Sequence, residues 1–163
     1  MKLVKLKGIV PRCIVELFEI LKNREAQDPE YKYEIYVSFL ELYNEDFIDL
    51  LNNTQQTKRR SQQQLPQVTE VSIREDITGQ IYWTGVKEEI CYSPQDVLNH
   101  LAQGSLNRTT GSTEMNSVSS RSHAIFSVLL KQQKPLEEDG KKMVKSLSSK
   151  FHFVDLAGSE RVK

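Results

Sequence analysis

The sequence predicts an α/β protein in which helices flank a central mixed β-sheet. Apolar residues recur at helical spacing in two segments, and short apolar runs typical of strands lie between and after them. The elements follow the order helix, strand, β-hairpin, helix, strand, strand, which favours a sheet with helices on its faces. The 163 residues are enough for one ordinary domain.

The first part of the chain predicts one helix and one long strand. The helix runs from Pro11 to Lys22 and carries one apolar stripe, formed by Ile14, Leu17, Phe18 and Leu21. Residues 23–32 are polar, contain Pro29 and predict a loop. The nearly continuous apolar run from Tyr33 to Tyr43 is typical of a strand covered on both faces. Residues 46–51 favour a short helical turn.

The middle of the chain predicts a long loop followed by a hairpin. Residues 54–67 hold six Gln and the basic cluster Lys58-Arg59-Arg60, which is typical of a flexible surface loop. Residues 68–74, a turn at Gly79 and a strand over residues 81–86 predict the hairpin.

The second predicted helix has a clear start signal. Ser93 stands at the capping position, Pro94 at the first helical position, and the acidic Asp96 three residues after the cap. The helix should end near Gly104, because glycine favours the backbone conformation that follows a helix.

The last third of the chain alternates between polar connections and apolar strands. Residues 107–121 and 132–149 are polar and predict connections, whereas residues 124–130 and 151–156 are apolar and predict strands. The final strand leads into Asp155-Leu156-Ala157-Gly158.

Composition excludes several classes of protein. Lys plus Arg and Asp plus Glu both number 22, so bulk charge does not indicate a nucleic-acid partner. No apolar run approaches the roughly 20 residues that span a bilayer, so we expect no membrane partner. Cys13 and Cys91 have no metal or redox spacing, and a reduced cytoplasmic or nuclear protein is the simplest interpretation.

A carboxylate, Asp155, stands near the end of the apolar strand within the segment Phe151–Arg161. Open α/β sheets bind ligands at the carboxyl ends of strands, where a carboxylate can hold a metal ion or one of its waters. Gly158 would let the backbone approach such a ligand closely. A strand followed by an ordinary turn explains these residues equally well.

A second segment, Asn116–Ala124, is rich in hydroxyl groups. Hydroxyls suit a hard cation and phosphate oxygens. The planar guanidinium of Arg121 could pair with a carboxylate through two hydrogen bonds. Taken alone, a solvated Ser-rich loop that caps the next strand is the better interpretation.

Together the two segments closely resemble the nucleotide-sensing switches of kinesin motors. Residues 116–123 read Asn-x-x-Ser-Ser-Arg-Ser-His and are similar to switch I, and residues 155–160 read Asp-Leu-Ala-Gly-Ser-Glu and are similar to the start of switch II. Three more stretches agree with kinesins in order: Gly8-Ile9-Val10-Pro11-Arg12, Phe39-Leu40-Glu41-Leu42-Tyr43-Asn44-Glu45 and Gly104-Ser105-Leu106-Asn107-Arg108. By this resemblance, residues 1–163 are identified as a partial kinesin motor domain with the P-loop NTPase fold.

A finer resemblance concerns the branch of the family. The Arg74-Glu75-Asp76 turn and the strand at residues 81–86 most resemble the chromokinesin branch, which is kinesin-4-like.

The resemblance implies ATP and Mg²⁺ as cofactors and gives each switch residue a role. Ser120 would ligate Mg²⁺, and Ser119 would contact the γ-phosphate and the attacking water. Asp155 would hold a water of the magnesium shell, and the Gly158 N–H would sense the γ-phosphate. Asn116 would position the attacking water or the loop.

The resemblance also implies how the two switches close. Arg121 and Glu160 would form a salt bridge between them, and Glu160 could relay the proton from the attacking water through a second water. Positioning and charge stabilisation are what phosphoryl transfer mainly needs. For His123, anchoring the loop to the sheet is a better interpretation than a catalytic role, and His100 and His152 look structural.

Two exposed segments leave alternatives open. Residues 76–80 lie where kinesins carry a tubulin-facing loop, although exposed charge in a loop is the ordinary explanation. Lys58-Arg59-Arg60 could touch the acidic tails of tubulin or act in nuclear import, and a solvated insertion is the better interpretation.

The sequence departs from a complete motor domain. None of the seven glycines is followed by Lys-Ser or Lys-Thr, so the phosphate-binding loop of a P-loop ATPase is missing. The adenine-contacting start and the microtubule-binding helices that follow switch II in kinesins are missing too. We therefore expect the central part of a motor, which alone would expose apolar faces and be unstable or aggregate.

The predicted function is the central part of a microtubule motor that couples ATP hydrolysis to movement along microtubules. The alternative is a truncated, non-enzymatic fragment that binds tubulin or another protein without ATP turnover. The expected location is cytoplasmic, on the cytoskeleton, with the nucleus or spindle as the other option. Direction, cargo and oligomeric state are not given, and a dimeric full-length parent stays open.

Overall fold

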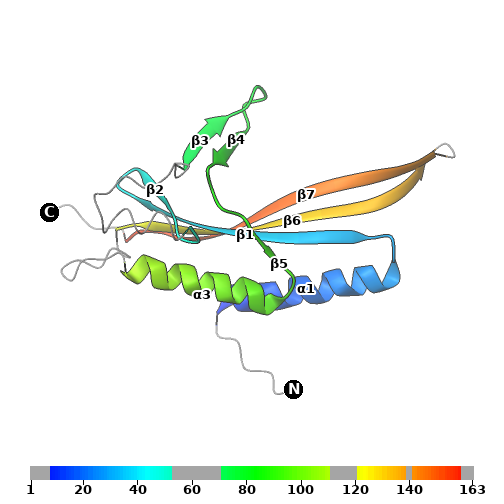
Figure 1. Ribbon diagram of the computed structural model, residues 1–163, viewed down its shortest axis with the longest axis horizontal. Coiled ribbons are helices and arrows are strands. Elements are labelled where there is room, and N and C mark those ends of the chain that lie inside the picture. The colour runs from blue at the N-terminus through cyan, green and yellow to red at the C-terminus, as the bar shows by residue number, and fades with distance from the viewer. Residues whose placement is uncertain (1–7, 53–70, 111–120, 139–140, 159–163) are drawn as a thin grey trace, which may run out of the picture.

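The computed structural model describes residues 8–52, 71–110, 121–138 and 141–158. In these residues, two helices lie on one face of a five-stranded sheet (Figure 1). The helices are α1 (Ile9–Gln27) and α3 (Pro94–Thr110). The sheet strands are β1 (Lys32–Tyr43), β2 (Asp46–Asp49), β5 (Glu89–Cys91), β6 (His123–Glu138) and β7 (Lys141–Asp155). A separate two-stranded hairpin contains β3 (Ser72–Glu75) and β4 (Ile81–Thr84).

Strand β1 organises the sheet. It pairs with β6 along nearly its whole length, and on its other side with β5 and then with β2. Strand β7 pairs with β6. The α/β class is confirmed, but the expected mixed sheet is not found, since every strand pair in the described residues is antiparallel.

The hydrophobic core lies between the sheet and the two helices. On α1 the inward stripe is Ile14, Phe18 and Leu21, each 1% exposed, and Val97 of α3 is fully buried. The sheet contributes alternate residues of β1 and β6: Ile35, Val37, Phe39, Phe126 and Val128. The predicted α1 stripe is thus confirmed, with Leu17 partly buried at its edge. Residues 37–41 are all buried, which confirms a strand covered on both faces in that stretch.

Both helices are longer than predicted. Helix α1 continues to Gln27 through residues predicted as a loop, because residues 23–27 lack Gly and Pro and favour helix. The prediction that α3 ends near Gly104 is wrong, since α3 continues to Thr110. Gly104 does not end the helix but lets α3 pack closely against Phe39 of β1, because a Cβ built at Gly104 would lie 2.2 Å from Cδ1 of Phe39. The predicted cap of α3 is confirmed, because the Asp96 N–H donates to Ser93 Oγ at 3.2 Å.

The predicted helical turn at residues 46–51 is wrong. Residues 46–49 form strand β2, which pairs with residues 40–43 of β1. The two residues between these strands, Asn44 and Glu45, have φ values of 51° and 67°. Two consecutive residues with positive φ make the tight hairpin that matches the twist of antiparallel strands.

The polar connection predicted at residues 132–149 is also wrong. These residues belong to β6 and β7, which form a long hairpin that extends beyond β1 (Figure 1). Fifteen residue pairs join the two strands, from Ala124 and Asp155 to Glu138 and Lys141. Cross-strand pairing therefore overrides the polar composition of this segment.

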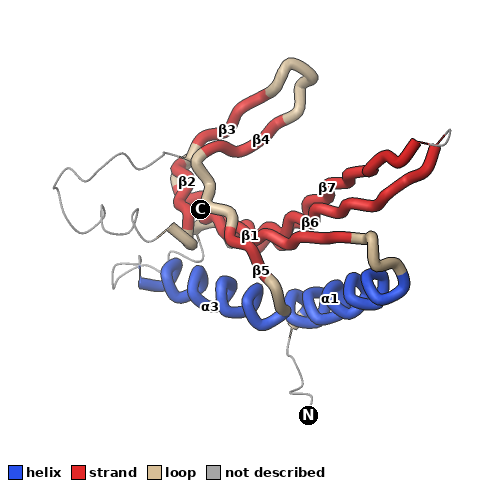
Figure 2. The backbone as a smooth tube through the Cα atoms, turned by 45° about the vertical axis from the view of Figure 1, so that its right-hand side comes forward, coloured by secondary structure: helices blue, strands red, loops and turns tan. Residues whose placement is uncertain are grey.

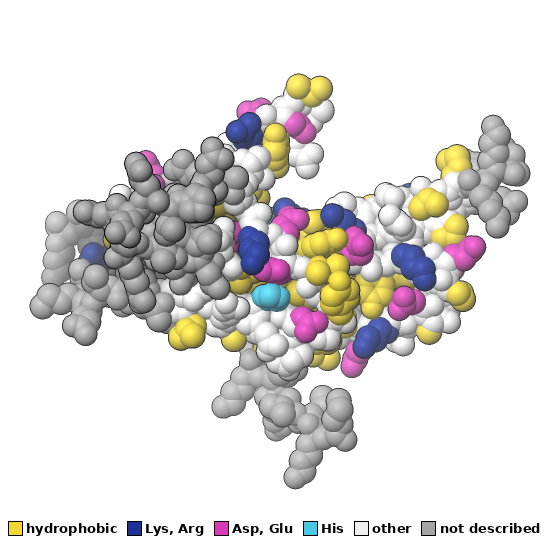
Figure 3. Space-filling view, viewed as in Figure 1, with side chains coloured by type: hydrophobic (Ala, Val, Ile, Leu, Met, Phe, Trp, Pro, Cys, Tyr) yellow, Lys and Arg dark blue, Asp and Glu magenta, His cyan; other side chains and the backbone are white. Residues whose placement is uncertain are grey.

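Strand β7 lies at the edge of the described sheet and is not the buried strand that its apolar sequence predicts. Five of its hydrophobic side chains are about half exposed, namely Met143 51%, Val144 64%, Leu147 53%, Phe151 57% and Val154 53%, whereas Phe153 packs against the core. Hydrophobic side chains reach the surface over the protruding part of β6 and β7, among charged ones (Figure 3).

The β3–β4 hairpin projects from the side of the sheet opposite the helices (Figure 2). It confirms the predicted hairpin for residues 72–84, whereas the predicted loop at residues 54–67 lies outside the described residues. Phe47 of β2 contacts Trp83 edge to face, with ring centroids 5.1 Å apart. Among the described residues, no helix is long and apolar enough to cross a membrane.

Candidate functional site

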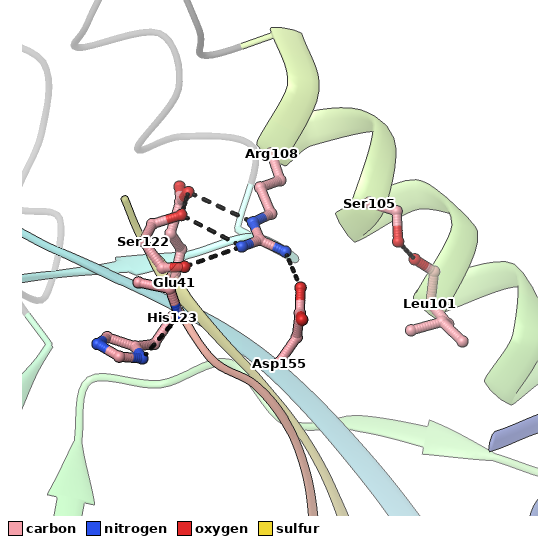
Figure 4. Close-up of polar contacts among 8 residues, drawn as sticks. Glu41, Leu101, Ser105, Arg108, Ser122, His123 and Asp155 are labelled. Carbon is pink, nitrogen blue, oxygen red and sulfur yellow. Dashed lines mark hydrogen bonds and ion pairs between the residues drawn. The ribbon is translucent and has the colours of Figure 1, made fainter. Parts of the chain in front are cut away.

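Four polar side chains meet where the last turn of α3 reaches the ends of β1 and β7 (Figure 4). Arg108 Nη1 donates to Asp155 Oδ2 at 2.9 Å, and Nη2 donates to the backbone oxygen of Ser122 at 3.0 Å and to its Oγ at 3.3 Å. Ser122 Oγ donates to Glu41 Oε1 at 2.7 Å, and Arg108 Nε lies 3.6 Å from that same oxygen. We call Glu41, Arg108, Ser122 and Asp155 the Arg108 cluster.

The strand register explains why these side chains meet. Glu41, Ala124 and Asp155 stand directly opposite one another on β1, β6 and β7. Neighbouring strands are about 4.8 Å apart, so the backbones of Glu41 and Asp155 are about 10 Å apart. Ala124 between them has a small side chain, which leaves room for the guanidinium of Arg108 to reach both carboxylates.

The cluster has a buried end and an exposed end. The side chain of Glu41 is 2% exposed and that of Arg108 is 12% exposed, whereas that of Asp155 is 72% exposed. A buried carboxylate is stable only when it is paired or hydrogen-bonded, so Glu41 and Arg108 depend on each other. Solvent weakens the Arg108–Asp155 pair, which can therefore exchange partners more readily. One guanidinium faces two carboxylates, so these groups together carry one net negative charge.

A second contact joins the same two chain segments. The N–H of Ala157, two residues after Asp155, donates to Nδ1 of His123 at 3.1 Å. His123 follows Ser122 directly, so the entry to β6 and the exit from β7 are linked twice. His123 therefore anchors the segment after β7, whereas the sequence predicted that it anchors its own loop to the sheet.

The last turn of α3 is itself held in place next to Arg108. Asn107 Nδ2 donates to the backbone oxygen of Leu50 at 2.7 Å. The buried Asp49 shapes that stretch by accepting the N–H of Leu51 at 2.9 Å and the N–H of Lys87 at 2.7 Å. Burial raises the pKa of the Asp49 carboxyl, although these two hydrogen bonds oppose the rise.

The structure describes three of the seven predicted site residues. Asp155 belongs to the Arg108 cluster, Gly158 lies exposed three residues later, and Arg121 is exposed beside Ser122. The other predicted site residues lie outside the described residues: Asn116, Ser119, Ser120 and Glu160. Their roles, and the salt bridge predicted for Arg121 with Glu160, stay predictions.

Arg121 does not take part in the Arg108 cluster. It lines an open cavity of about 370 Å³ beside the β1–β2 hairpin, together with Leu42, Asn44, Glu45, Phe47 and His123. The two arginines near the hydroxyl-rich segment thus face different surroundings: Arg108 is nearly buried among carboxylates, and Arg121 remains exposed.

The donor atoms fit a water-mediated magnesium site better than a cage of protein ligands. In the described residues, no three His, Cys, Asp or Glu side chains are grouped to hold a metal ion. Mg²⁺ usually keeps several waters and takes one or two protein oxygens plus substrate phosphates. An exposed carboxylate at a strand end, such as Asp155, suits one such contact, and this role of Asp155 stays a prediction.

Sequence reasoning missed Glu41, Arg108 and Ser122 as members of a site, although all three lie in the motifs that resemble kinesins. One signal was available for Glu41. It continues the inward-facing row of Ile35, Val37 and Phe39, so a carboxylate occupies a position where the alternation predicts an apolar side chain. A buried carboxylate indicates a buried cationic or hydroxyl partner.

His152 has the structural role predicted for it. Its Nδ1 is hydrogen-bonded to Ser127 Oγ at 2.8 Å across β6 and β7. Burial, with a smaller contribution from Lys150, lowers the pKa of the imidazole.

Comparisons with known proteins agree with this fold. The kinesin motor domain model matches residues 2–163. The human kinesin-like protein KIF21B is 40% identical over 179 residues, which covers 96% of this chain and 10% of that protein. The chromosome-associated kinesin KIF4 of Xenopus laevis is 39% identical over 156 residues, covering 96% of this chain and 11% of that protein.

A solved structure of a fast kinesin is also similar. It has a TM-score of 0.72 and 30% sequence identity, and the match covers 95% of this chain and 38% of that one. The chain thus spans about a tenth of the length of the curated relatives. The family match over residues 2–163, supported by the shared fold, shows that this chain belongs to the kinesin motor-domain family.

Proposed function

We propose that this chain is the nucleotide-responsive central part of a microtubule motor that couples ATP hydrolysis to movement along microtubules. The observation that supports this best is the guanidinium of Arg108, which contacts Ser122 at the entry to β6 and Asp155 at the end of β7. These residues belong to the two segments that resemble the switches of kinesins. A single side chain thus joins the segments that must respond together to a nucleotide.

The roles of the remaining site residues follow from the resemblance. Ser120 would ligate Mg²⁺, and Asp155 would hold one of its waters. The bound ion would neutralise charge on the phosphates. Ser119 and Asn116 would orient the attacking water, and the N–H of Gly158 would sense the γ-phosphate.

The closing of the two switches is a further part of the proposal. Arg121 and Glu160 would pair when the γ-phosphate is bound, and Glu160 would pass on the proton of the attacking water. Release of the phosphate would free this pair and loosen both segments, which is how order–disorder switches transmit nucleotide state.

Turnover by the whole protein that carries this sequence tests the proposal. We expect ATP hydrolysis stimulated by microtubules, and a loss of about a hundredfold or more in kcat for Ser120→Ala, since the hydroxyl would act on the metal directly. Ser105→Ala, an exposed hydroxyl on α3, is the matched control and should retain turnover. Normal turnover in Ser120→Ala would show that the site assignment is wrong.

Microtubule binding separates the motor from the alternative function. A motor should pellet with microtubules to an extent that depends on the bound nucleotide. Pelleting that is unchanged by nucleotide, with no ATP turnover, would support a non-enzymatic tubulin-binding protein. We place the protein on the microtubule cytoskeleton, with the spindle and nucleus as further locations.

The chromokinesin branch, which is kinesin-4-like, is a finer proposal. It rests on residues 74–76 and 81–86, which lie in the β3–β4 hairpin and directly after it. Chromosome-associated kinesins are 37% to 41% identical to this chain, but KIF7 of Danio rerio is 40% identical as well, so identity alone does not select the branch. Imaging of the tagged protein in dividing cells tests it: association with chromosomes supports this branch, and confinement to interphase microtubules contradicts it.

A further inference from the structure

We propose that Glu41 is the positioning residue of this site: by holding both Arg108 and Ser122, it couples the segment before β6 to Asp155. This inference rests on the proposed function and assigns a role to a residue that makes no contact with Asp155 itself. The contacts within the Arg108 cluster carry it, and each is visible in Figure 4.

Glu41 is held firmly within the sheet. It lies in the middle of the sheet, paired on one side with Ile48 of β2 and on the other with Ala124 of β6. The residue is 1% exposed, so its carboxylate cannot turn to water. Its Oε1 oxygen accepts the Ser122 hydroxyl and faces Arg108 Nε. Glu41 is therefore the rigid end of the cluster.

Arg108 connects the buried Glu41 to the exposed carboxylate of Asp155. Nε faces Glu41, Nη2 donates to Ser122, and Nη1 is left pointing at Asp155. A guanidinium is planar, so the two hydrogen bonds of Nη2 to Ser122 and the ion pair of Nε with Glu41 together set the direction of Nη1. Without Glu41, the guanidinium could rotate, and Asp155 would lose its fixed partner.

Ser122 connects the chain before β6 to the same Arg108 that contacts Asp155. Its hydroxyl binds Glu41 while its carbonyl accepts from Arg108, so any movement of the chain before β6 disturbs the same guanidinium that holds Asp155. The charge on Glu41 is required as well as its shape, because an uncharged amide would hold the Ser122 hydroxyl but attract Arg108 less.

A double-mutant cycle on the affinity for Mg·ADP tests this coupling in the whole protein that carries this sequence. A fluorescent ADP analogue, titrated at fixed Mg²⁺, reports the affinity without turnover. We expect Glu41→Gln and Asp155→Asn each to weaken binding by about ten- to a hundredfold. The double variant should bind about as weakly as Asp155→Asn alone, because Glu41 acts through Asp155.

The matched control is Glu34→Gln, which removes a carboxylate from an exposed position of the same strand. Glu34→Gln should leave the affinity for Mg·ADP unchanged, and combining it with Asp155→Asn should weaken binding no more than Asp155→Asn alone does. If Glu41→Gln folds poorly, as a lowered melting temperature would show, Ser122→Ala replaces it in the cycle, since this change removes the hydroxyl and retains the carbonyl used by Arg108.

A spectroscopic readout follows the geometry without a ligand. The Nε–H signal of Arg108, observed by ¹⁵N NMR, should shift in Glu41→Gln and remain in place in Glu34→Gln. Affinity losses that multiply in the double variant, or an Arg108 signal that does not move, would overturn the inference while the proposed function stands. A wild-type protein that neither binds Mg·ADP nor hydrolyses ATP would overturn the proposed function, and this inference with it.

Discussion

The guanidinium of Arg108, at the end of α3, donates a hydrogen bond to the carboxylate of Asp155, at the end of β7, over 2.9 Å. The two residues are 47 positions apart in the chain, and Ser122, which directly precedes β6, accepts a hydrogen bond from the same guanidinium. This relationship links the helix that precedes the hydroxyl-rich segment with the strand that leads into the second switch-like segment.

Arg108→Lys should lower ATP turnover by the whole protein by about tenfold or more, because a lysine is a point charge and cannot reach Glu41, Ser122 and Asp155 together. Steady-state kinetics at varied Mg·ATP measures this. Arg24→Lys, an exposed arginine on α1 with one long hydrogen bond of 3.5 Å, is the control and should retain turnover. Equal rates for the two variants would contradict a role for the guanidinium geometry.

Gly104→Ala should destabilise the fold by about 1–3 kcal/mol, although alanine favours helix more than glycine does. The added Cβ would lie 2.2 Å from the ring of Phe39, so helix and strand would have to separate. Urea unfolding followed by circular dichroism measures the change. The neighbouring Ser105→Ala is the control and should cost little. A more stable Gly104→Ala variant would mean that α3 does not approach β1 this closely.

Glu45→Gly should stabilise the β1–β2 hairpin by about 1 kcal/mol, since Glu45 has a φ of 67°, which glycine adopts without a steric penalty. The same substitution at the next residue, Asp46→Gly, should destabilise the protein, because that residue lies in strand β2. Thermal unfolding of both variants measures the difference. If both variants lose stability equally, the turn does not have this conformation in solution.

The carboxyls of Asp96 and Asp49 should titrate on opposite sides of 3.8, the ordinary pKa of aspartate. The N–H of Tyr92 and the hydroxyl of Ser93 lower the pKa of Asp96, whereas burial raises that of Asp49. A lowered pKa means that Asp96 stabilises the fold above its unfolded pKa, and that this stabilisation is lost as the pH falls through the folded pKa.

The pH dependence is reversed for Asp49, because its pKa is higher in the folded than in the unfolded protein. Its contribution to stability is present below the unfolded pKa and is lost as the pH rises through the folded pKa. Carbon-13 NMR titration of the two side-chain carboxyls measures both midpoints. A midpoint for Asp96 at or above 3.8 would contradict the hydrogen bonds at the start of α3.

Phe151→Lys should reduce self-association of this chain, because the exposed hydrophobic edge of β7 is a surface on which a second strand can pair. Sedimentation velocity over a range of concentrations measures the association. Ile20→Lys changes a hydrophobic side chain on α1 that is 44% exposed and should have little effect. A wild-type chain that is monomeric at every concentration would contradict the prediction.

The sequence predicted the elements whose signals are local. The apolar stripe of α1, the cap of α3 at Ser93, strand β1 and the β3–β4 hairpin were all confirmed, because spacing, capping and turn residues act over a few positions. The motifs at residues 116–123 and 155–160 pointed to the kinesin family, and the family match confirmed it.

Two of the errors lie where distant contacts decide the outcome. Gly104 looked like a helix terminator, but its packing against Phe39 keeps it inside α3. The polar residues 132–149 looked like a connection, but pairing between β6 and β7 makes them strands. In each case a contact between elements outweighs a local preference of less than about 1 kcal/mol per residue.

The sequence by itself therefore determined the α/β class, the family and the identity of the two switch-like segments, because residue types and their order carry that information. Only the tertiary structure decided which side chains meet. Arg108 contacts Asp155 and Ser122 because the last turn of α3 lies next to the end of β7 and the residue before β6. Glu41 joins them because the register of three strands sets it in line with Ala124 and Asp155. Register and helix placement depend on packing across the whole core, which no short stretch of sequence contains.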